Sequence, residues 1–157
     1  MSSHKLTILV GSLLLSLPLS SQGVDSDGLS LIVEQRGSSI HVFIVNVGSS
    51  VARVNTRFAT GRAQSSAELV FEITDSTGKH YNYRPKPQYG PIDERYIAQL
   101  RPSDFVGRRI TMERLKRKYG LIPGEYTMRA TYRNHYADSG GMYTRHLVSD
   151  PISIVVD

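Results

Sequence analysis

The segment Leu121-Ile-Pro-Gly-Glu-Tyr-Thr-Met128 carries the clearest fold signal in this chain. In several antiparallel β-sandwiches, a tyrosine near the start of one strand hydrogen-bonds to backbone a few residues upstream and fixes the corner between the two sheets. Here Pro123 and Gly124 supply a turn directly before Tyr126. We therefore predict that Tyr126 forms such a tyrosine corner, with an ordinary core tyrosine as the alternative.

Stretches of alternating apolar and polar residues lie on both sides of this segment, and such alternation indicates strands with one face in the core. We predict strands over residues 29–35, 40–48, 51–59, 67–74, 80–84, 105–112, 124–134 and 149–157, with a shorter apolar stretch at 96–100. Residues 115–121 predict a single helical turn, because Leu115 and Tyr119 are four apart. About seven short strands separated by regular turns predict an all-β, antiparallel, immunoglobulin-like β-sandwich.

Some of these stretches have further features. Residues 40–48 are apolar on both faces, which is typical of a strand in the middle of a sheet. The strands at 67–74 and 80–84 flank the turn residues 75–78 and predict a β-hairpin. Residues 85–91 contain three prolines, which excludes them from a central strand. Met128 stands where immunoglobulin domains have a disulfide cysteine.

The composition fits one globular domain. The chain has 157 residues, with 19 Lys and Arg against 14 Asp and Glu, and it contains no cysteine and no tryptophan. This length fits a single domain of ordinary size. Because cysteine is absent, a disulfide framework, a Cys-ligated zinc or iron–sulfur site and a thiol nucleophile are all excluded.

The N-terminus has the pattern of a secretory signal peptide. The uncharged run Leu6–Leu19 follows Lys5 and is shorter than the ~20 residues needed to span a bilayer. Small residues at Ser21 and Gly23 suit cleavage after Gly23. We therefore expect a signal peptide over residues 1–23, one domain over 24–157 without a transmembrane span, and a periplasmic or secreted location. A retained N-terminal anchor is the alternative.

The residues around the corner also resemble a known family. The pattern comprises Tyr96-Ile-Ala-Gln-Leu100, Pro102, Ile110, Leu115, Tyr119-Gly-Leu121, Pro123-Gly-Glu-Tyr126 and Tyr132. It resembles the immunoglobulin-like N-terminal domain of deuterolysin-type, peptidyl-Lys metallopeptidases, and it is similar to exported bacterial domains of fibronectin-III type with an L-x-P-G-x-Y-x-x-R-A-x-Y strand. The resemblance implies an accessory, inhibitory or adhesive sandwich. It does not imply a peptidase, because no histidine is followed by Glu and the zinc motif H-E-x-x-H is therefore missing.

A basic cluster precedes the corner. Six cations lie between residues 108 and 118, opposed only by Glu113: Arg108, Arg109, Arg114, Lys116, Arg117 and Lys118. Such a cluster can bind an anionic polymer, lipid head groups or an acidic protein. The alternative is a solvated strand edge whose charges discourage edge-to-edge pairing. We expect the partner to be a protein or an anionic envelope component, and we do not expect nucleic acid as the partner of an exported chain.

Loop tyrosines form a second set of candidate contacts. Exposed tyrosines are effective contact residues because they offer a large area at low entropic cost. Tyr89, Tyr136 and Tyr143 lie in predicted loops beside Gly or Asp, and we expect them to be exposed. Tyrosines that alternate along a strand are instead expected to be core residues or cross-strand partners.

The remaining polar residues predict neither a catalytic site nor a cofactor. His135, Asp138 and His146 lie in or beside one loop, but their spacing is not typical of zinc sites, and we predict no metal. The chain has no G-x-S-x-G motif. We therefore predict an exported, non-enzymatic binding or accessory module that acts through loops and a basic edge. The alternatives are an inhibitor or pro-domain-like partner of a secreted peptidase, and a small hydrolase with an unrecognised site. The sequence leaves the oligomeric state open.

Overall fold

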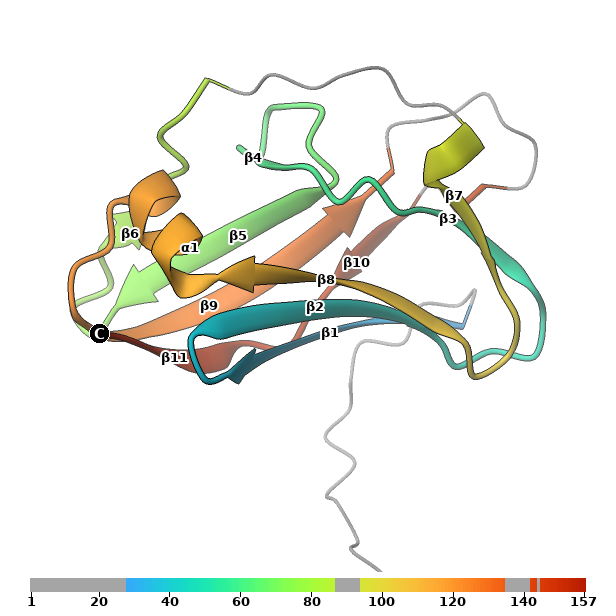
Figure 1. Ribbon diagram of the computed structural model, residues 1–157, viewed down its shortest axis with the longest axis horizontal. Helices are drawn as coiled ribbons and strands as arrows, with labels where there is room; N and C mark the ends of the chain where they lie inside the picture. The colour runs from blue at the N-terminus through green and yellow to red at the C-terminus, as the bar shows by residue number, and fades with distance from the viewer. Residues whose placement is uncertain (1–27, 87–93, 135–141, 144) are drawn as a thin grey trace, which may run out of the picture.

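A computed structural model describes residues 28–86, 94–134, 142–143 and 145–157, which form an all-β sandwich (Figure 1). The first sheet contains β1 (Leu29–Arg36), β2 (Ser39–Asn46) and β8 (Phe105–Thr111), which are antiparallel and follow the order β1-β2-β8. The middle position of β2 confirms the prediction from its apolar sequence.

The second sheet is built on β5 (Leu69–Asp75) and β9 (Gly124–Arg133), which are paired antiparallel along their length. Two strands pair with the other edge of β9, namely β10 (His146–Val148) and β11 (Ile152–Val156). Two short strands share the other edge of β5: β4 (Thr60–Gly61), which is parallel to its start, and β6 (His80–Tyr81), which is antiparallel to its end. The hairpin of β5 and β6 is the predicted one, although β6 has only 2 residues.

A separate two-stranded ribbon consists of β3 (Ala52–Asn55) and β7 (Ile97–Leu100), and the 3-10 turn η1 (Glu94–Tyr96) precedes β7. The strand predicted over residues 51–59 is shorter in the structure and ends at Asn55. The reason is local, because Phe58 has a φ of 47° and a residue in this left-handed region interrupts an extended strand.

The core lies between the two sheets and contains the apolar residues of every second strand position. The largest completely enclosed aliphatic side chains are Leu29, Ile40, Ile44, Leu69, Ile73, Leu115, Met128, Leu147 and Ile154. Burial of one such side chain contributes about 1.5–3 kcal/mol. Because the chain has no disulfide, this core is the main source of its stability.

Tyr126 makes the hydrogen bonds of the predicted tyrosine corner. Its hydroxyl donates to the carbonyl of Ile122 at 2.8 Å and accepts from the amide of the same residue at 3.3 Å. The ring is 4% exposed and packs edge-on against Tyr81, with 5.2 Å between the ring centroids. The corner therefore ties the turn before β9 to the sheet itself.

The helix α1 (Met112–Tyr119) lies before the corner and is longer than the predicted single turn. Thr111 caps its start, where the side-chain oxygen accepts from the amide of Arg114 at 3.3 Å. Gly120 ends it with a φ of 70° and donates its amide to the carbonyl of Lys116 at 2.7 Å. The first turn is not evident from the sequence, because residues 105–112 also fit a strand.

The predicted signal peptide, residues 1–23, lies outside the described residues. Within the described part of the chain, no helix has the length and apolar character needed to cross a bilayer.

Candidate binding cleft

The six cations of the predicted basic cluster do not form one continuous surface. Three are exposed: Arg109, Arg114 and Arg117. The other three donate hydrogen bonds within the protein: Arg108, Lys116 and Lys118. Arg109 also points to the opposite face of β8 from Arg108, because side chains alternate along a strand. The sequence pattern therefore predicts a larger basic surface than the structure has.

Arg108 has a structural role. Its guanidinium donates to the carbonyl of Arg57 at 2.8 Å and to that of Phe58 at 3.3 Å. Burial, with a smaller contribution from the positive charge of Arg114, lowers the pKa of Arg108. These bonds hold the segment between β3 and β4, so the inner side of β8 does not present this cation to a partner.

Of the three tyrosines expected to be exposed, only Tyr143 lies within the described residues. The expectation is wrong for Tyr143, which is 6% exposed. Its amide donates to the carbonyl of Arg53 at 2.9 Å, and its carbonyl accepts from the side chain of Asn134 at 2.9 Å. These two bonds hold Tyr143 against β3. They are made by backbone atoms of Tyr143, so the sequence does not indicate them. Tyr89 and Tyr136 lie outside the described residues.

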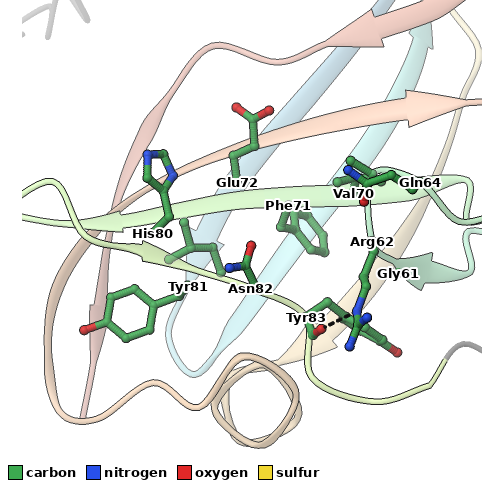
Figure 2. A pocket seen from close by; sticks show the side chains of 12 residues that line it. Gly61, Arg62, Gln64, Val70, Phe71, Glu72, His80, Tyr81, Asn82 and Tyr83 are labelled. Atoms are coloured by element: carbon green, nitrogen blue, oxygen red, sulfur yellow. Dashed lines mark hydrogen bonds between the residues drawn. The ribbon is translucent and has the colours of Figure 1, made fainter.

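A cleft of about 600 Å³ opens beside β5 (Figure 2). This volume is typical of ligand pockets, which span about 300–1,000 Å³. One wall is β4 with the turn that follows it, and the other is β6 with the segment that follows it. The polar side chains of the lining include Arg62, Gln64, Glu72, His80 and Asn82.

The cleft exists because β4 and β6 pair with only the two ends of β5. Gly61 of β4 lies opposite Val70, and Tyr81 of β6 lies opposite Ile73. Among the described strands, residues 71–72 have no partner on this edge. The edge of β5 is therefore open in its middle, and the two walls need separate anchors.

Glu68, directly before β5, anchors the first wall. Its side chain is 0% exposed, and its carboxylate accepts from the Arg57 guanidinium at 2.9 Å (Nε) and 2.5 Å (Nη2). It also accepts from the amide of Ala59 at 2.9 Å and from the side chain of Asn55 at 3.2 Å. A buried carboxylate requires such compensation, because burial removes its hydration. The network therefore fixes the path of the chain from β3 into β4.

Tyr132 extends this network from β9. Its hydroxyl donates to the carbonyl of Asn55 and accepts from the amide of Asn55, both at 3.0 Å. The side chain is 0% exposed, and burial raises the pKa of Tyr132. The end of β3 is thereby attached to the second sheet.

Asp75, at the end of β5, anchors the second wall. Its carboxylate accepts from the hydroxyl of Thr77 at 2.6 Å, the amide of Lys79 at 3.1 Å and the hydroxyl of Tyr81 at 3.0 Å. These bonds, above all the one from the Thr77 hydroxyl, lower the pKa of Asp75 to about 2. Partial burial and the neighbouring Asp75 carboxylate raise the pKa of Tyr81 to about 12. The turn therefore sets the position of β6.

Two cations bond to the segment that follows β6, and this segment contains a third, Arg84. Arg62 donates to the carbonyl of Tyr83 at 3.0 Å, as Figure 2 shows, and to the carbonyl of Arg84 at 3.2 Å. Lys118 donates to the hydroxyl of Tyr83 at 2.6 Å, and its ammonium lies 4.9 Å from the centre of that ring. These acceptors are neutral, and no carboxylate of the described residues forms an ion pair with Arg62, Arg84 or Lys118. Their positive charges are therefore not neutralised within the described protein.

Arg84 lies against Gly120 at the end of α1. A Cβ at residue 120 would be 1.8 Å from the guanidinium carbon of Arg84. The amide of Arg84 also donates to the carbonyl of Lys118 at 2.8 Å. This bond gives a partner to one of the carbonyls in the last turn of the helix, which have none within the helix. A second cleft, of about 300 Å³, opens on this side and is lined by Lys79 and Arg84. We refer to the two clefts with their lining cations Arg62, Lys79 and Arg84, together with the neighbouring Lys118, as the basic cleft.

Sequence patterns do not reveal the basic cleft, because its cations come from segments far apart in the chain. The sequence does contain an indication of Glu68, the anchor of the first wall. Glu68 stands between Ala67 and Leu69 at the start of an apolar strand, and a carboxylate in such a place indicates a buried acid with a cationic partner.

No group of three or more His, Asp and Glu side chains within the described ranges is arranged to hold a metal ion. His146 is exposed on β10, whereas His135 and Asp138 lie outside the described residues. No family model matches this chain, and no curated protein is significantly similar to it. Its function is therefore inferred from its fold and from the basic cleft.

Proposed function

We propose that this chain is an exported, non-enzymatic binding module whose partner is a protein or an envelope component with negative charge, and that the partner binds at the basic cleft. One observation carries the proposal. Arg62 bonds to the backbone of Tyr83 and Arg84, and Lys118 bonds to the Tyr83 hydroxyl, so cations without a carboxylate partner among the described residues lie beside the two clefts.

Hydrogen-bond donors without a partner among the described residues favour an anionic partner. A guanidinium has five N–H donors and an ammonium has three. Arg62 directs its Nε and Nη2 groups to backbone carbonyls, and Lys118 donates to the hydroxyls of Tyr83 and Thr60. A carboxylate, phosphate or sulfate group can accept the remaining donors, with charge-assisted bonds that are stronger than those to neutral oxygens.

The other groups in the cleft favour a polar partner with its own donors and acceptors. His80 and Asn82 are exposed on one wall, and Gln64 is exposed on the other. Phe71 also lines the cleft, but it is 4% exposed and offers little apolar surface. A partner that pairs its polar groups with these side chains and places an anion beside Arg62 uses both features.

The test compares two double variants that change the net charge equally. Arg62→Glu with Arg84→Glu reverses the basic cleft, whereas Arg114→Glu with Arg117→Glu reverses the exposed cations of α1. Each protein is applied to immobilised heparin, a sulfated polyanion, and eluted with increasing salt. Because the attraction is electrostatic, we expect the cleft variant to elute at a clearly lower salt concentration than the α1 variant. Thermal unfolding of both variants shows whether they remain folded.

Two outcomes contradict the proposal. Equal shifts for both variants indicate attraction by net charge without a defined site. A larger shift for the α1 variant places the anion site on the exposed basic residues of α1. Capture of partners from envelope fractions with the same variants then tests whether the natural partner follows the order seen with heparin.

A further inference from the structure

The outer face of the first sheet carries the exposed Phe105 beside partly buried aromatic and aliphatic side chains. Phe105 is 66% exposed. Phe43 lies between His41 and Phe105, with ring centroids 6.0 Å and 5.8 Å away. The outer face of β9 carries instead polar side chains such as Thr127 and Arg129. An apolar patch on one outer face of a sandwich is a candidate interaction surface.

The strand registers arrange this face in rows that cross β1, β2 and β8. The first row contains Ser30, which is 1% exposed, Val45 and Phe105. The second row contains Ile32, Phe43 and Gly107. The third row contains Glu34, His41 and Arg109. The third row therefore has an acid at the β1 edge and a base at the β8 edge, next to two rows that are mostly apolar.

We propose that this face binds a second copy of the chain, through a two-fold axis parallel to the strands. Such an axis reverses the strand order, so that β1 of one copy lies over β8 of the other. Glu34 of each copy then faces Arg109 of the other, and the two Phe43 rings meet at the axis. The two faces contact at the usual spacing of stacked sheets, about 10 Å.

The charge pattern selects this axis over the perpendicular one in the same plane. A two-fold axis across the strands and through the charged row places Glu34 over Glu34 and Arg109 over Arg109, which is repulsive. The same axis through the Phe43 row places the charged row over Val45 and Phe105, which buries charge without a partner. The strand-parallel axis alone pairs opposite charges twice, so the face is complementary to itself.

Two contacts already hold the face in the required form. The Phe43 ring lies across β8, where a Cβ on Gly107 would be 2.5 Å from its Cδ1 atom. The carboxylate of Glu34 is held on this face by Arg36 at 2.7 Å, and the Glu34 side chain is 33% exposed. The ring needs no reorganisation when a second copy binds, and the Glu34 carboxylate is then shared between Arg36 of its own copy and Arg109 of the other. The inference is independent of the basic cleft, which lies at the edge of the other sheet.

The first test is sedimentation of the purified protein over a wide concentration range, with its N-terminus determined by mass spectrometry. A three-stranded face is a small interface, so we expect a reversible dimer with a Kd of about 10⁻⁶–10⁻⁴ M. Phe105→Ser is expected to raise the Kd by at least about tenfold. Ile122→Ser is the matched control, because Ile122 is also 66% exposed but lies outside this face, and its Kd should not change.

The second test establishes the axis. Glu34→Arg and Arg109→Glu each place like charges opposite one another, and each is expected to raise the Kd by about tenfold. In an equimolar mixture of the two variants, every contact between the two unlike copies again joins opposite charges. We therefore expect a mixed dimer with an affinity near that of the unaltered protein. A monomer at all concentrations, a dimer insensitive to Phe105→Ser, or a mixture no tighter than either variant overturns the proposal.

Discussion

The two ends of β5 are both held by a carboxylate, but the two carboxylates act in different surroundings. Glu68 is completely buried and is neutralised by the Arg57 guanidinium, whose side chain is 11% exposed. Asp75 lies in a turn that is open to water and accepts from neutral hydroxyl and amide groups. In the buried place, loss of either partner leaves a charge without hydration, whereas in the turn water can replace a lost donor. The first anchor therefore supports the fold, and the second one mainly positions a hairpin.

This difference bears directly on the basic cleft. One wall continues from the buried network at Glu68, and the other continues from the open turn at Asp75. Arg62 connects the two walls by its bonds to the backbone after β6. We therefore expect the wall at the Asp75 end to adjust more readily when a partner binds. Three experiments, in order of decreasing expected effect on stability, distinguish the role of Glu68 from that of Asp75.

Glu68→Gln is expected to have the largest effect. It leaves the Arg57 guanidinium buried without its counter-charge, and we expect the free energy of unfolding to fall by about 3–5 kcal/mol. Urea denaturation measures this change. Glu72→Gln is the matched control on the exposed face of the same strand, and its effect should stay within about 0.5 kcal/mol. Equal effects of the two substitutions would contradict the role assigned to Glu68.

Tyr132→Phe is expected to have an intermediate effect. It leaves both the amide and the carbonyl of Asn55 without the hydroxyl partner, which costs about 1–3 kcal/mol. Tyr81→Phe removes one hydroxyl bond at the other end of β5, where water can reach the Asp75 carboxylate, and we expect a smaller loss. Thermal unfolding of the two variants side by side gives the order. The reverse order would show that the open turn, not the buried network, holds the cleft.

Titration of Asp75 is expected to have the smallest effect. Its pKa of about 2 in the folded protein lies below the value of about 3.9 in an unfolded chain. The ionised form is therefore favoured by folding, and its contribution is complete above pH ~4 and lost as the pH falls toward about 2. NMR titration of the Asp75 carboxyl measures the pKa, and Asp75→Asn should remove this part of the acid dependence. A pKa near the unfolded value would mean that the turn bonds do not favour the ionised form.

Local patterns were sufficient wherever a feature depends on residues close in sequence. Tyr126 bonds to a residue only four positions away, so its role is visible in one short segment. The same holds for the β5–β6 hairpin, whose turn residues lie between its strands. They were not sufficient for β10, whose 3 residues are too few for an alternation to be recognised. The exposure predicted for Tyr143 is wrong because its bonds to Arg53 and Asn134 hold it against β3.

The candidate site shows the same difference between features set by neighbouring residues and features set by distant ones. The run of cations at residues 108–118 is conspicuous in the sequence, but alternation along β8 and the faces of α1 direct those side chains to different places. The basic cleft was not visible, because Arg62 and Lys118 meet at Tyr83 only after the strands and the helix have packed.

The sequence by itself determined the fold class, the central position of β2 and the corner at Tyr126, because alternation and turn residues act over a few neighbours. Only the tertiary structure decided which charges remain available. It pairs Arg57 with Glu68 in the interior, turns Arg108 inward, and brings Arg62 and Lys118 together at Tyr83. The physical reason is that burial and pairing of a charge depend on groups supplied by distant segments, and packing alone sets those distances.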